Sequence, residues 1–454
     1  MIAAYQHVKR DVFQADFSEW LTRFSAMLIT GLCFQEISLA LSGIKRNAIS
    51  MAFILLVFIF YFSHVLLLAI HYNYGTHYND FAVIRYGEDV YIQSMDTTID
   101  LVMALYYGLL SASFIGRRGK QKREVRFSEV NALYLGIIII CLTTPFFIVG
   151  AIRFFFSMSV YGYAYAASHA GYSVNTYAFM RMSLVGFVLC LLSCKKEKNA
   201  RKLIFAASVL YFLAMFSGQR AYNLLFIITL FLVYFIRYKN MHVSAKTVFA
   251  ISAGLFLLIE TINIIRNTRA AGMDLSLLRS GFTDRSSNPV LDLLREFGIT
   301  ENAAVYTWMN QIKPVGGMQL FTSFLTAVPG VSRLFSGIRF SSYNVTDALD
   351  MWNFGGGIIP DVIFDFGKNA YWACFLLGVG LQKFYELFLS TIYRRRELLG
   401  AFLSPLLCEA VFCIRSTAYK IPRLLFLYGL LFIVFMCIYL LLSVFCKMSR
   451  NKEV

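Results

Sequence analysis

The stretch AFILLVFIFYFSHVLLLAIHY, residues 52–72, decides the fold class of this chain. It is almost wholly apolar and long enough to cross a hydrocarbon core of about 30 Å, which takes roughly 20 helical residues. Residues 131–151 and 424–446 have the same character. Since 58% of the 454 residues are hydrophobic, against roughly 45–50% in soluble domains, the sequence predicts an integral membrane protein.

Weaker apolar segments bring the expected number of transmembrane helices to about eleven. They are residues 24–43, 101–116, 176–194, 203–218, 221–237, 247–265, 371–389 and 398–414. The segment 24–43 is the least apolar, because Gln35 and Glu36 lie in its middle. Since the chain has no internal repeat and no low-complexity linker, we expect one all-α membrane domain over residues 1–454.

Lysine and arginine give the chain a formal net charge of +16. They gather in connections between the predicted helices, such as residues 117–126, 195–202 and 394–396. By the positive-inside rule, these connections face the cytoplasm. The charge therefore indicates topology, with the C-terminus inside and the N-terminus outside, and gives no support to nucleic-acid binding.

The nine cysteines lie inside or at the ends of predicted spans. A disulfide framework is therefore unsupported, and no Cys-x-x-Cys pair or Cys/His cluster has the spacing of metal ligands.

One long connection, residues 266–367, lacks a convincing membrane span and falls outside the membrane by the charge pattern. Long ordered loops of this kind commonly carry function. Short helical patterns occur at 287–299, where Ser287 or Asn288 is a candidate cap, and at 317–330. The loop is rich in arginine, which indicates either a solvated surface or an anionic ligand, because guanidinium groups match phosphate oxygens bidentately.

Three ionisable residues within predicted spans are functional candidates by default: Arg181, Glu260 and Glu409. We expect each to find its partner on another helix. A purely structural ion pair is the alternative to a functional role.

The segment GGGIIPDVIFDFGKNA, residues 355–370, places two carboxylates beside a predicted span. Pro360 suits the first position of a helix, and Asp361 and Asp365 are four residues apart, on one helix face. Helix capping explains Asp361 as well as chemistry does. Asp365 lies more than a turn further along, where burial without a partner is costly.

The longer run SSYNVTDALDMWNFGGGIIPDVIFDFGKNAYWACFLLGVGL, residues 341–381, resembles the bacterial O-antigen or oligosaccharide repeat-unit polymerases of the Wzy type. Members of that family show a glycine cluster, an acidic residue, an aromatic residue and an Asn-Phe-Gly-like triplet entering a membrane helix. Here Gly355 to Gly357, Asp361 and Asp365-Phe366-Gly367 fill the pattern, with Asp361 where Glu is common and Asp365 where Asn is common.

Two further segments carry the resemblance. SGQRAYNL, residues 217–224, is similar to the family's Gly-x-Arg segment between two helices, and Arg415-Ser416 is similar to its late outer arginine. The order of these motifs along the chain is more specific than any one of them.

The resemblance implies a GT-C-like bundle of helices that catalyses glycosyl transfer at the outer face of the bacterial inner membrane. A sugar chain would move from its undecaprenyl diphosphate carrier onto the non-reducing end of another lipid-linked repeat unit. No metal or cofactor is implied, because the outer arginines would stabilise the leaving diphosphate. A chain-length regulator protein is a candidate partner.

On this resemblance, Asp361 is the candidate acid/base residue. The candidates for binding the lipid-linked substrate are Arg220, Arg266, Arg269, Arg415, Asp365 and Tyr343. Aromatic residues such as Tyr343 stack on sugar rings, although anchoring at the membrane interface explains them equally well.

Two other classes of protein are alternatives. O-antigen ligases share the many-helix plan but resemble one another in a functional histidine in the outer loop, and none of the six histidines here falls between residues 266 and 366. Flippases of lipid-linked sugars usually show two related halves, which this sequence lacks.

Overall fold

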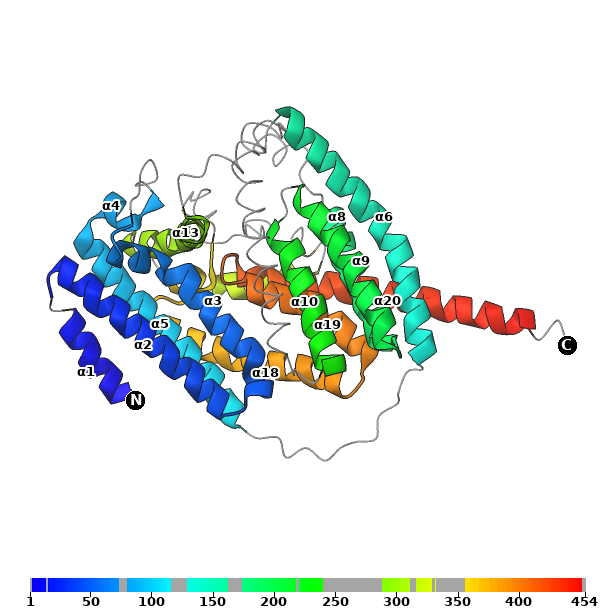
Figure 1. Ribbon diagram of the computed structural model, residues 1–454, viewed down its shortest axis with the longest axis horizontal. Helices are drawn as coiled ribbons and strands as arrows, with labels where there is room; N and C mark the ends of the chain where they lie inside the picture. Colours follow the sequence, from blue (N-terminus) through cyan, green and yellow to red (C-terminus); the bar gives the residue numbers. More distant parts are fainter. Residues whose placement is uncertain are drawn as a thin grey trace. The chain divides into compact units, whose positions relative to one another are not determined.

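A computed structural model describes residues 2–13, 15–72, 80–115, 129–161, 174–217, 220–239, 288–310, 316–328, 331 and 356–450 (Figure 1). The regular structure of these residues is helical throughout, which confirms the all-α prediction. Within them, seven helices are long and apolar enough to cross a membrane. Every predicted span except 247–265 falls on a helix, and 247–265 lies outside the described residues.

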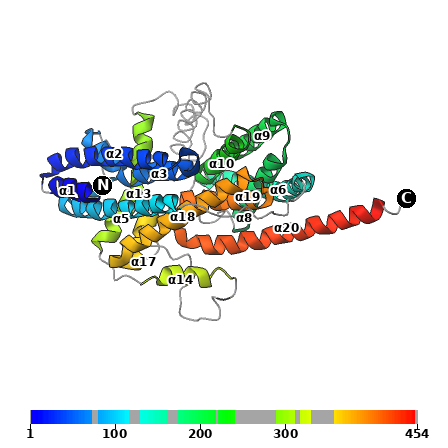
Figure 2. The ribbon, with the colours of Figure 1, turned by 90° about the horizontal axis from the view of Figure 1, so that it is seen from below.

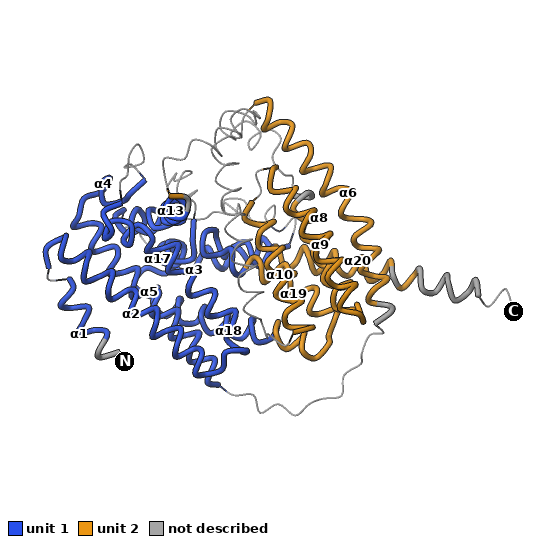
Figure 3. The backbone as a smooth tube through the Cα atoms, in the orientation of Figure 1, with its two compact units in different colours: residues 1–120, 290–387, 410–423 blue, residues 121–289, 388–409, 424–454 orange. Residues whose placement is uncertain are grey.

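The chain divides into two compact units, shown in different colours in Figure 3. Unit 1 comprises residues 1–120, 290–387 and 410–423, and unit 2 comprises residues 121–289, 388–409 and 424–454. The expectation of one domain over residues 1–454 stays a prediction.

Unit 1 is built from helices of the N-terminal third, of the long loop and of later parts of the chain. They are α1 (Ile2–Val12), α2 (Phe17–Leu41), α3 (Ile44–Ala69), α4 (Ala82–Tyr86), α5 (Glu88–Phe114), nearly all of α13 (Pro289–Met309), α14 (Met318–Leu325), α17 (Ile358–Phe366), the 3-10 helices η2 (Gly367–Asn369) and η3 (Ala418–Lys420), and most of α18 (Ala370–Tyr393). Figure 2 shows α14 beside α17, two helices that pack against each other.

The aromatic core of unit 1 joins α2 to α3. Trp20 and Phe24 stack with ring centroids 4.8 Å apart, and Phe24 meets Phe62 of α3 edge-on at 6.2 Å. Trp20, Phe24 and Phe62 are fully buried. Aromatic pairs in these geometries add to the stability gained from burial alone.

Helices α5 and α18 touch through their backbones. A Cβ atom added to Gly108 would lie 2.1 Å from the carbonyl oxygen of Phe375, and one added to Gly378 would lie 2.1 Å from that of Leu105. Small residues allow this close approach between membrane helices. Glycine is therefore required at both positions of the crossing.

The C-terminal half of α18 is also bound to α3. Gln382 Nε2 donates to Asn47 Oδ1 at 2.8 Å, and Arg46 Nε donates to Glu386 Oε1 at 2.6 Å. Asn47, Gln382 and Glu386 are buried, so these hydrogen bonds hold the register between the two helices.

Unit 2 consists of α6 (Glu129–Tyr161), α8 (Val174–Ser193), α9 (Glu197–Met215), α10 (Arg220–Lys239), most of α19 (Glu397–Phe412) and most of α20 (Ile421–Arg450). A Cβ atom on Gly136 would lie 3.0 Å from the carbonyl oxygen of Gly186, so α6 and α8 also cross closely at glycines. Beyond this crossing α6 contains Pro145, which removes a backbone donor from the helix interior.

Candidate functional site

The predicted acid/base residue Asp361 lies in the first turn of α17 and is 1% exposed. Its peptide N–H donates to the carbonyl oxygen of Gly357 at 3.1 Å, and its own carbonyl oxygen accepts from the Tyr419 hydroxyl at 3.2 Å. The cap residue of α17 is Gly357, four residues earlier, so Asp361 is not an N-cap. Helix α17 begins at Ile358, so Pro360 is its third residue. The prediction that Pro360 takes the first position of the helix is therefore wrong.

Gly357, the last glycine before Asp361, lies against a buried tyrosine. The Tyr61 hydroxyl of α3 donates to the carbonyl oxygen of Ile414 at 3.0 Å and accepts from the Ile359 N–H at 3.2 Å. A Cβ atom on Gly357 would lie 2.2 Å from the Tyr61 hydroxyl. Tyr61 therefore joins α17 to the segment that carries Arg415, and Gly357 leaves room for its hydroxyl group.

Asp365 caps a helix other than its own. Its two carboxylate oxygens accept from the backbone N–H groups of Gln319 at 3.1 Å and Leu320 at 3.2 Å, in the first turn of α14. The Gly317 N–H donates to the Asp365 carbonyl oxygen at 3.0 Å. Asp365 is fully buried, and a carboxylate is favoured at a helix N-terminus, so these bonds fix α14 on α17.

The predicted helix at 287–299 is confirmed as α13, which continues to Met309. Its buried residues are mainly polar or charged. Arg295 is 4% exposed and donates from Nη1 to Asp80 Oδ2 at 3.1 Å, while Asn302 Nδ2 donates to the Asp80 carbonyl oxygen at 2.6 Å. Leu291 and Leu294, whose spacing indicates the helix, are only half-buried.

Glu301 of α13 is a fully buried carboxyl group that the sequence did not single out. It accepts a hydrogen bond from the Tyr91 hydroxyl of α5. Burial raises the pKa of Glu301 to about 8, although the hydrogen bond from Tyr91 acts in the opposite direction. Glu301 is therefore expected to hold its proton to a higher pH than an exposed glutamate does.

His64 reaches the long loop from α3. Its Nε2 lies 2.9 Å from the Arg295 carbonyl oxygen, a contact in which Nε2 must carry the proton. The loop sequence contains no histidine between residues 266 and 366, but a histidine from outside the loop contacts α13.

The predicted substrate-binding residues are distributed over both units. Arg415 of unit 1 lies 3.9 Å from Glu296 Oε1, and 34% of its side chain is exposed. Arg220 is the first residue of α10 in unit 2 and is half-buried. Arg266, Arg269 and Tyr343 lie outside the described residues, as does Glu260. Of the predicted site residues, Asp361, Asp365 and Arg415 thus lie in unit 1.

Arg181 and Glu409, predicted to have partners on other helices, pair with each other in unit 2. Arg181 Nε donates to Glu409 Oε1 at 2.6 Å, and the Tyr222 hydroxyl donates to Glu409 Oε2 at 3.3 Å. The guanidinium lies over the rings of Tyr222, Tyr177 and Tyr428, at 4.8, 5.4 and 5.6 Å from their centroids. Arg181 is 5% exposed and Glu409 is fully buried.

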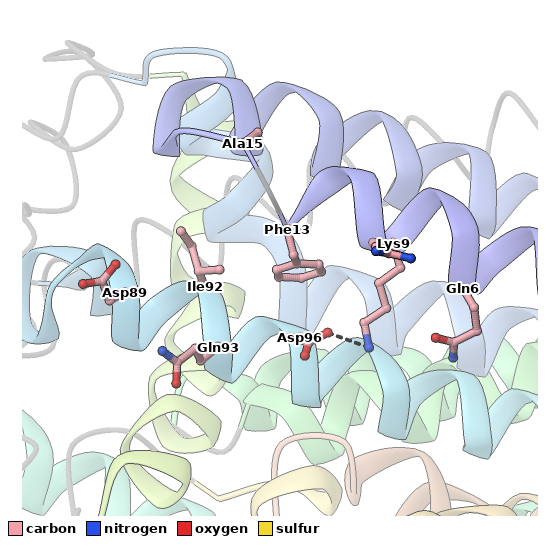
Figure 4. A pocket seen from close by; sticks show the side chains of 9 residues that line it. Gln6, Lys9, Phe13, Ala15, Asp89, Ile92, Gln93 and Asp96 are labelled. Atoms are coloured by element: carbon pink, nitrogen blue, oxygen red, sulfur yellow. Dashed lines mark ion pairs between the residues drawn. The ribbon is translucent and has the colours of Figure 1, made fainter.

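A polar pocket of about 590 Å³ lies between α1 and α5 in unit 1 (Figure 4). Figure 4 shows Lys9 directed at Asp96; its Nζ lies 2.5 Å from Asp96 Oδ1 and 2.6 Å from Asp100 Oδ2. Gln6, Arg10 and Gln93 complete much of the polar lining. These ion pairs hold α1 against α5 and leave the pocket lined by acids, bases and amides together.

Metal-ligand geometry is not found in the described part of the chain, where no group of three or more His, Cys, Asp or Glu side chains is placed to hold an ion.

The long apolar helices define an all-α polytopic membrane protein. The chain belongs to the O-antigen polysaccharide polymerase Wzy family, whose profile matches residues 18–306, more than half of its length. The match includes Arg220, Arg266 and Arg269 and ends before Asp361. No curated protein and no solved structure matches the chain.

Family membership identifies the activity in general terms: the protein is a polymerase of O-antigen oligosaccharide repeat units and acts on lipid-linked units. It confirms the predicted family.

Proposed function

We propose that the protein polymerises repeat units carried by undecaprenyl diphosphate, at the periplasmic face of the bacterial inner membrane, without a metal or cofactor. Membership of the Wzy family is the observation that carries this proposal. The basic connections on one side of the predicted spans support the orientation. A chain-length regulator protein is a candidate partner.

The proposed step is a glycosyl transfer with one bond formed and one broken. A hydroxyl group at the non-reducing end of the acceptor attacks the anomeric carbon of the donor, and the bond from that carbon to the diphosphate oxygen breaks. Asp361 accepts the proton of the attacking hydroxyl, which makes this oxygen a better nucleophile. The lipid diphosphate leaves with the negative charge.

Arginine is suited to the leaving group, because its planar guanidinium binds phosphate oxygens bidentately and remains charged at every physiological pH. We assign this role to Arg415 of unit 1, and to Arg220 on the sequence resemblance. Arg266 and Arg269 are assigned to it from the sequence alone. The exposed third of the Arg415 side chain supports its part in the proposal.

Asp365 and Tyr343 stay predicted substrate contacts. For Asp365, the two hydrogen bonds to α14 favour a positioning role, because they already engage both carboxylate oxygens. For Tyr343, stacking on a sugar ring rests on the sequence alone.

The deciding experiment is incubation of the purified protein, in membranes of defined lipid, with lipid-linked repeat units. We expect a ladder of longer lipid-linked chains. Transfer of the sugar to lipid A would instead identify a ligase. Movement across vesicles without a new glycosidic bond would identify a flippase, and either result would refute the proposed polymerase.

The same assay tests the arginines. Arg415→Ala should reduce chain growth roughly a hundredfold, because loss of one preorganised contact to a developing charge costs about that much. Arg423→Ala, which removes an exposed arginine from the same unit, is the matched control and should grow chains normally. A normal ladder from Arg415→Ala would remove this residue from the mechanism.

A further inference from the structure

Unit 2 contains an apolar groove that the proposed chemistry does not use. It has a volume of about 820 Å³ and lies between α6 and α9. The groove follows Pro145 along α6, beyond the close crossing of α6 with α8 at Gly136. Beyond its tight crossing with α8, α6 therefore leaves space between itself and α9.

The α6 wall of the groove is formed by two adjacent rows of side chains, each with a spacing of four residues. Residues at this spacing lie above one another on one helix face. The rows are Phe147, Ala151 and Phe155, and Ile148, Ile152 and Phe156. Phe147 is fully buried and forms the base of the wall, whereas Ile152 is 49% and Phe156 61% exposed.

The α9 wall includes Leu210, Leu213, Ala214 and Ser217, which share one side of the helix and the turn that follows it. Alanines at positions 151 and 214 contribute room, because a larger side chain at either place would occupy the groove. The groove therefore has phenyl and aliphatic walls, which suit a long hydrocarbon chain better than a sugar.

A positively charged residue follows the last groove residue closely in the sequence. Arg220 comes three residues after Ser217, so their Cα atoms are at most about 11 Å apart. It is also the first residue of α10, where the N-terminus of a 20-residue helix favours an anion. Apolar walls next to a positive charge are complementary to a lipid with a long tail and an anionic head.

We propose that the groove between α6 and α9 binds the isoprenoid tail of the lipid carrier, with its phosphate groups directed toward Arg220. This inference rests on the proposed lipid-linked donor and adds the place where the carrier's tail lies. Methyl-branched, unsaturated isoprene units offer broad apolar surfaces to the phenylalanines of the α6 wall. An ordinary phospholipid acyl chain is the competing occupant.

A variant that fills the groove tests the proposal. Ala151→Phe removes space for the tail, so we expect at least a roughly tenfold lower rate with a donor on undecaprenyl diphosphate, equivalent to lost burial of about two methylene groups. A donor on a carrier of only two isoprene units does not fill the groove and should react as with the wild type. The matched control is Ile137→Phe, an exposed position of α6 outside the groove, which should leave both rates unchanged.

Each result of this comparison is decisive. Selective loss with the long carrier supports the tail site. An unchanged rate of Ala151→Phe with the long carrier overturns it, and so does an equal loss with both carriers, because damage to the tail site alone cannot affect the short one.

A binding experiment keeps this inference separate from the proposed reaction. A polyprenyl phosphate with a photoreactive diazirine on its tail should label peptides of α6 and α9, and excess undecaprenyl phosphate should suppress this labelling. Equal suppression by phosphatidylglycerol would refute a tail-specific site. A wild-type protein that binds the probe there yet extends no donor would instead refute the proposed polymerase reaction and leave the tail site standing.

Discussion

Glu409 of unit 2 and two carboxyl groups of unit 1, Asp365 and Glu301, are buried in opposite ways. In unit 2 the charge of Glu409 is compensated by Arg181, whose guanidinium is surrounded by three tyrosine rings. In unit 1 the carboxylate of Asp365 is held by backbone N–H groups, and Glu301 accepts from a tyrosine hydroxyl. The first arrangement uses an opposite charge. The second uses neutral donors.

The difference lies in what compensates the buried group. The guanidinium of Arg181 offsets the carboxylate of Glu409 with an opposite charge. Asp365 is stabilised by the dipoles of backbone N–H groups, without a second charge. Asp361, the proposed acid/base residue, lies in unit 1 with Asp365 and Glu301.

The largest expected effect is loss of polymerisation in Asp361→Asn. The amide has nearly the same shape and leaves the backbone contacts of α17 unchanged, but it cannot accept the proton of the attacking hydroxyl. Chain growth should fall by roughly 10² to 10⁴, the usual contribution of a positioned acid/base group. Thermal unfolding of the same preparation is the control and should be unchanged; a full rate would limit Asp361 to a structural role.

Arg181→Met should cause the largest loss of stability. It leaves the carboxylate of Glu409 buried without its cation, which costs about 3–5 kcal/mol. The double variant Arg181→Met/Glu409→Met removes both charges and should recover most of that loss in a denaturation experiment. If the double variant is no more stable than the single one, the pair does not compensate as described.

Because of Glu301, we expect the stability of unit 1 to depend on pH. The pKa of Glu301 rises from an ordinary 4.5 to about 8 in the folded protein, so between these values the folded state holds a proton that the unfolded state has lost. Stability should therefore fall as the pH rises through this window, by up to about 1.4 kcal/mol per pH unit, and then level off above the folded pKa.

Glu301→Gln tests this dependence, because glutamine does not titrate and keeps an acceptor for the Tyr91 hydroxyl. Unfolding temperatures measured from pH 5 to 9 should decline less steeply in the variant than in the wild type. Parallel curves would show that another group causes the dependence.

The smallest effect concerns Asp365. Asp365→Ala removes two hydrogen bonds from the first turn of α14, so we expect a loss of about 1–2 kcal/mol, confined to that helix. Hydrogen exchange at Gln319 and Leu320 should become faster. Thr326→Ala, at the other end of α14, is the control; lost polymerisation in Asp365→Ala with unchanged exchange would identify Asp365 as a substrate contact instead.

Helices were predictable because their signal is local. Continuous apolar runs locate α3, α6 and α20, and the cap and spacing at 287–299 locate the start of α13. The ends were less predictable: α13 continues ten residues beyond the predicted segment, to Met309, and buries a polar face that its leucines do not indicate.

The contacts around Asp361 could not be predicted in the same way. Tyr61 and Ile414 are 353 residues apart, and Asp365 and Gln319 are 46 apart, so only tertiary folding selects these partners. The cost of a buried charge predicted that Arg181 and Glu409 need partners on other helices. This cost did not predict that Arg181 and Glu409 would be each other's partner. Little in the sequence singles out Tyr61, because it is one tyrosine in an apolar run rich in phenylalanine.

The glycine contacts between α5 and α18 have a mechanical consequence. Two backbones in direct contact have no side-chain layer that can deform, so α5 and α18 are expected to move as one rigid pair. Helix α17, which carries Asp361, packs against α5. We therefore expect the position of the Asp361 backbone to change little when unit 1 binds a ligand.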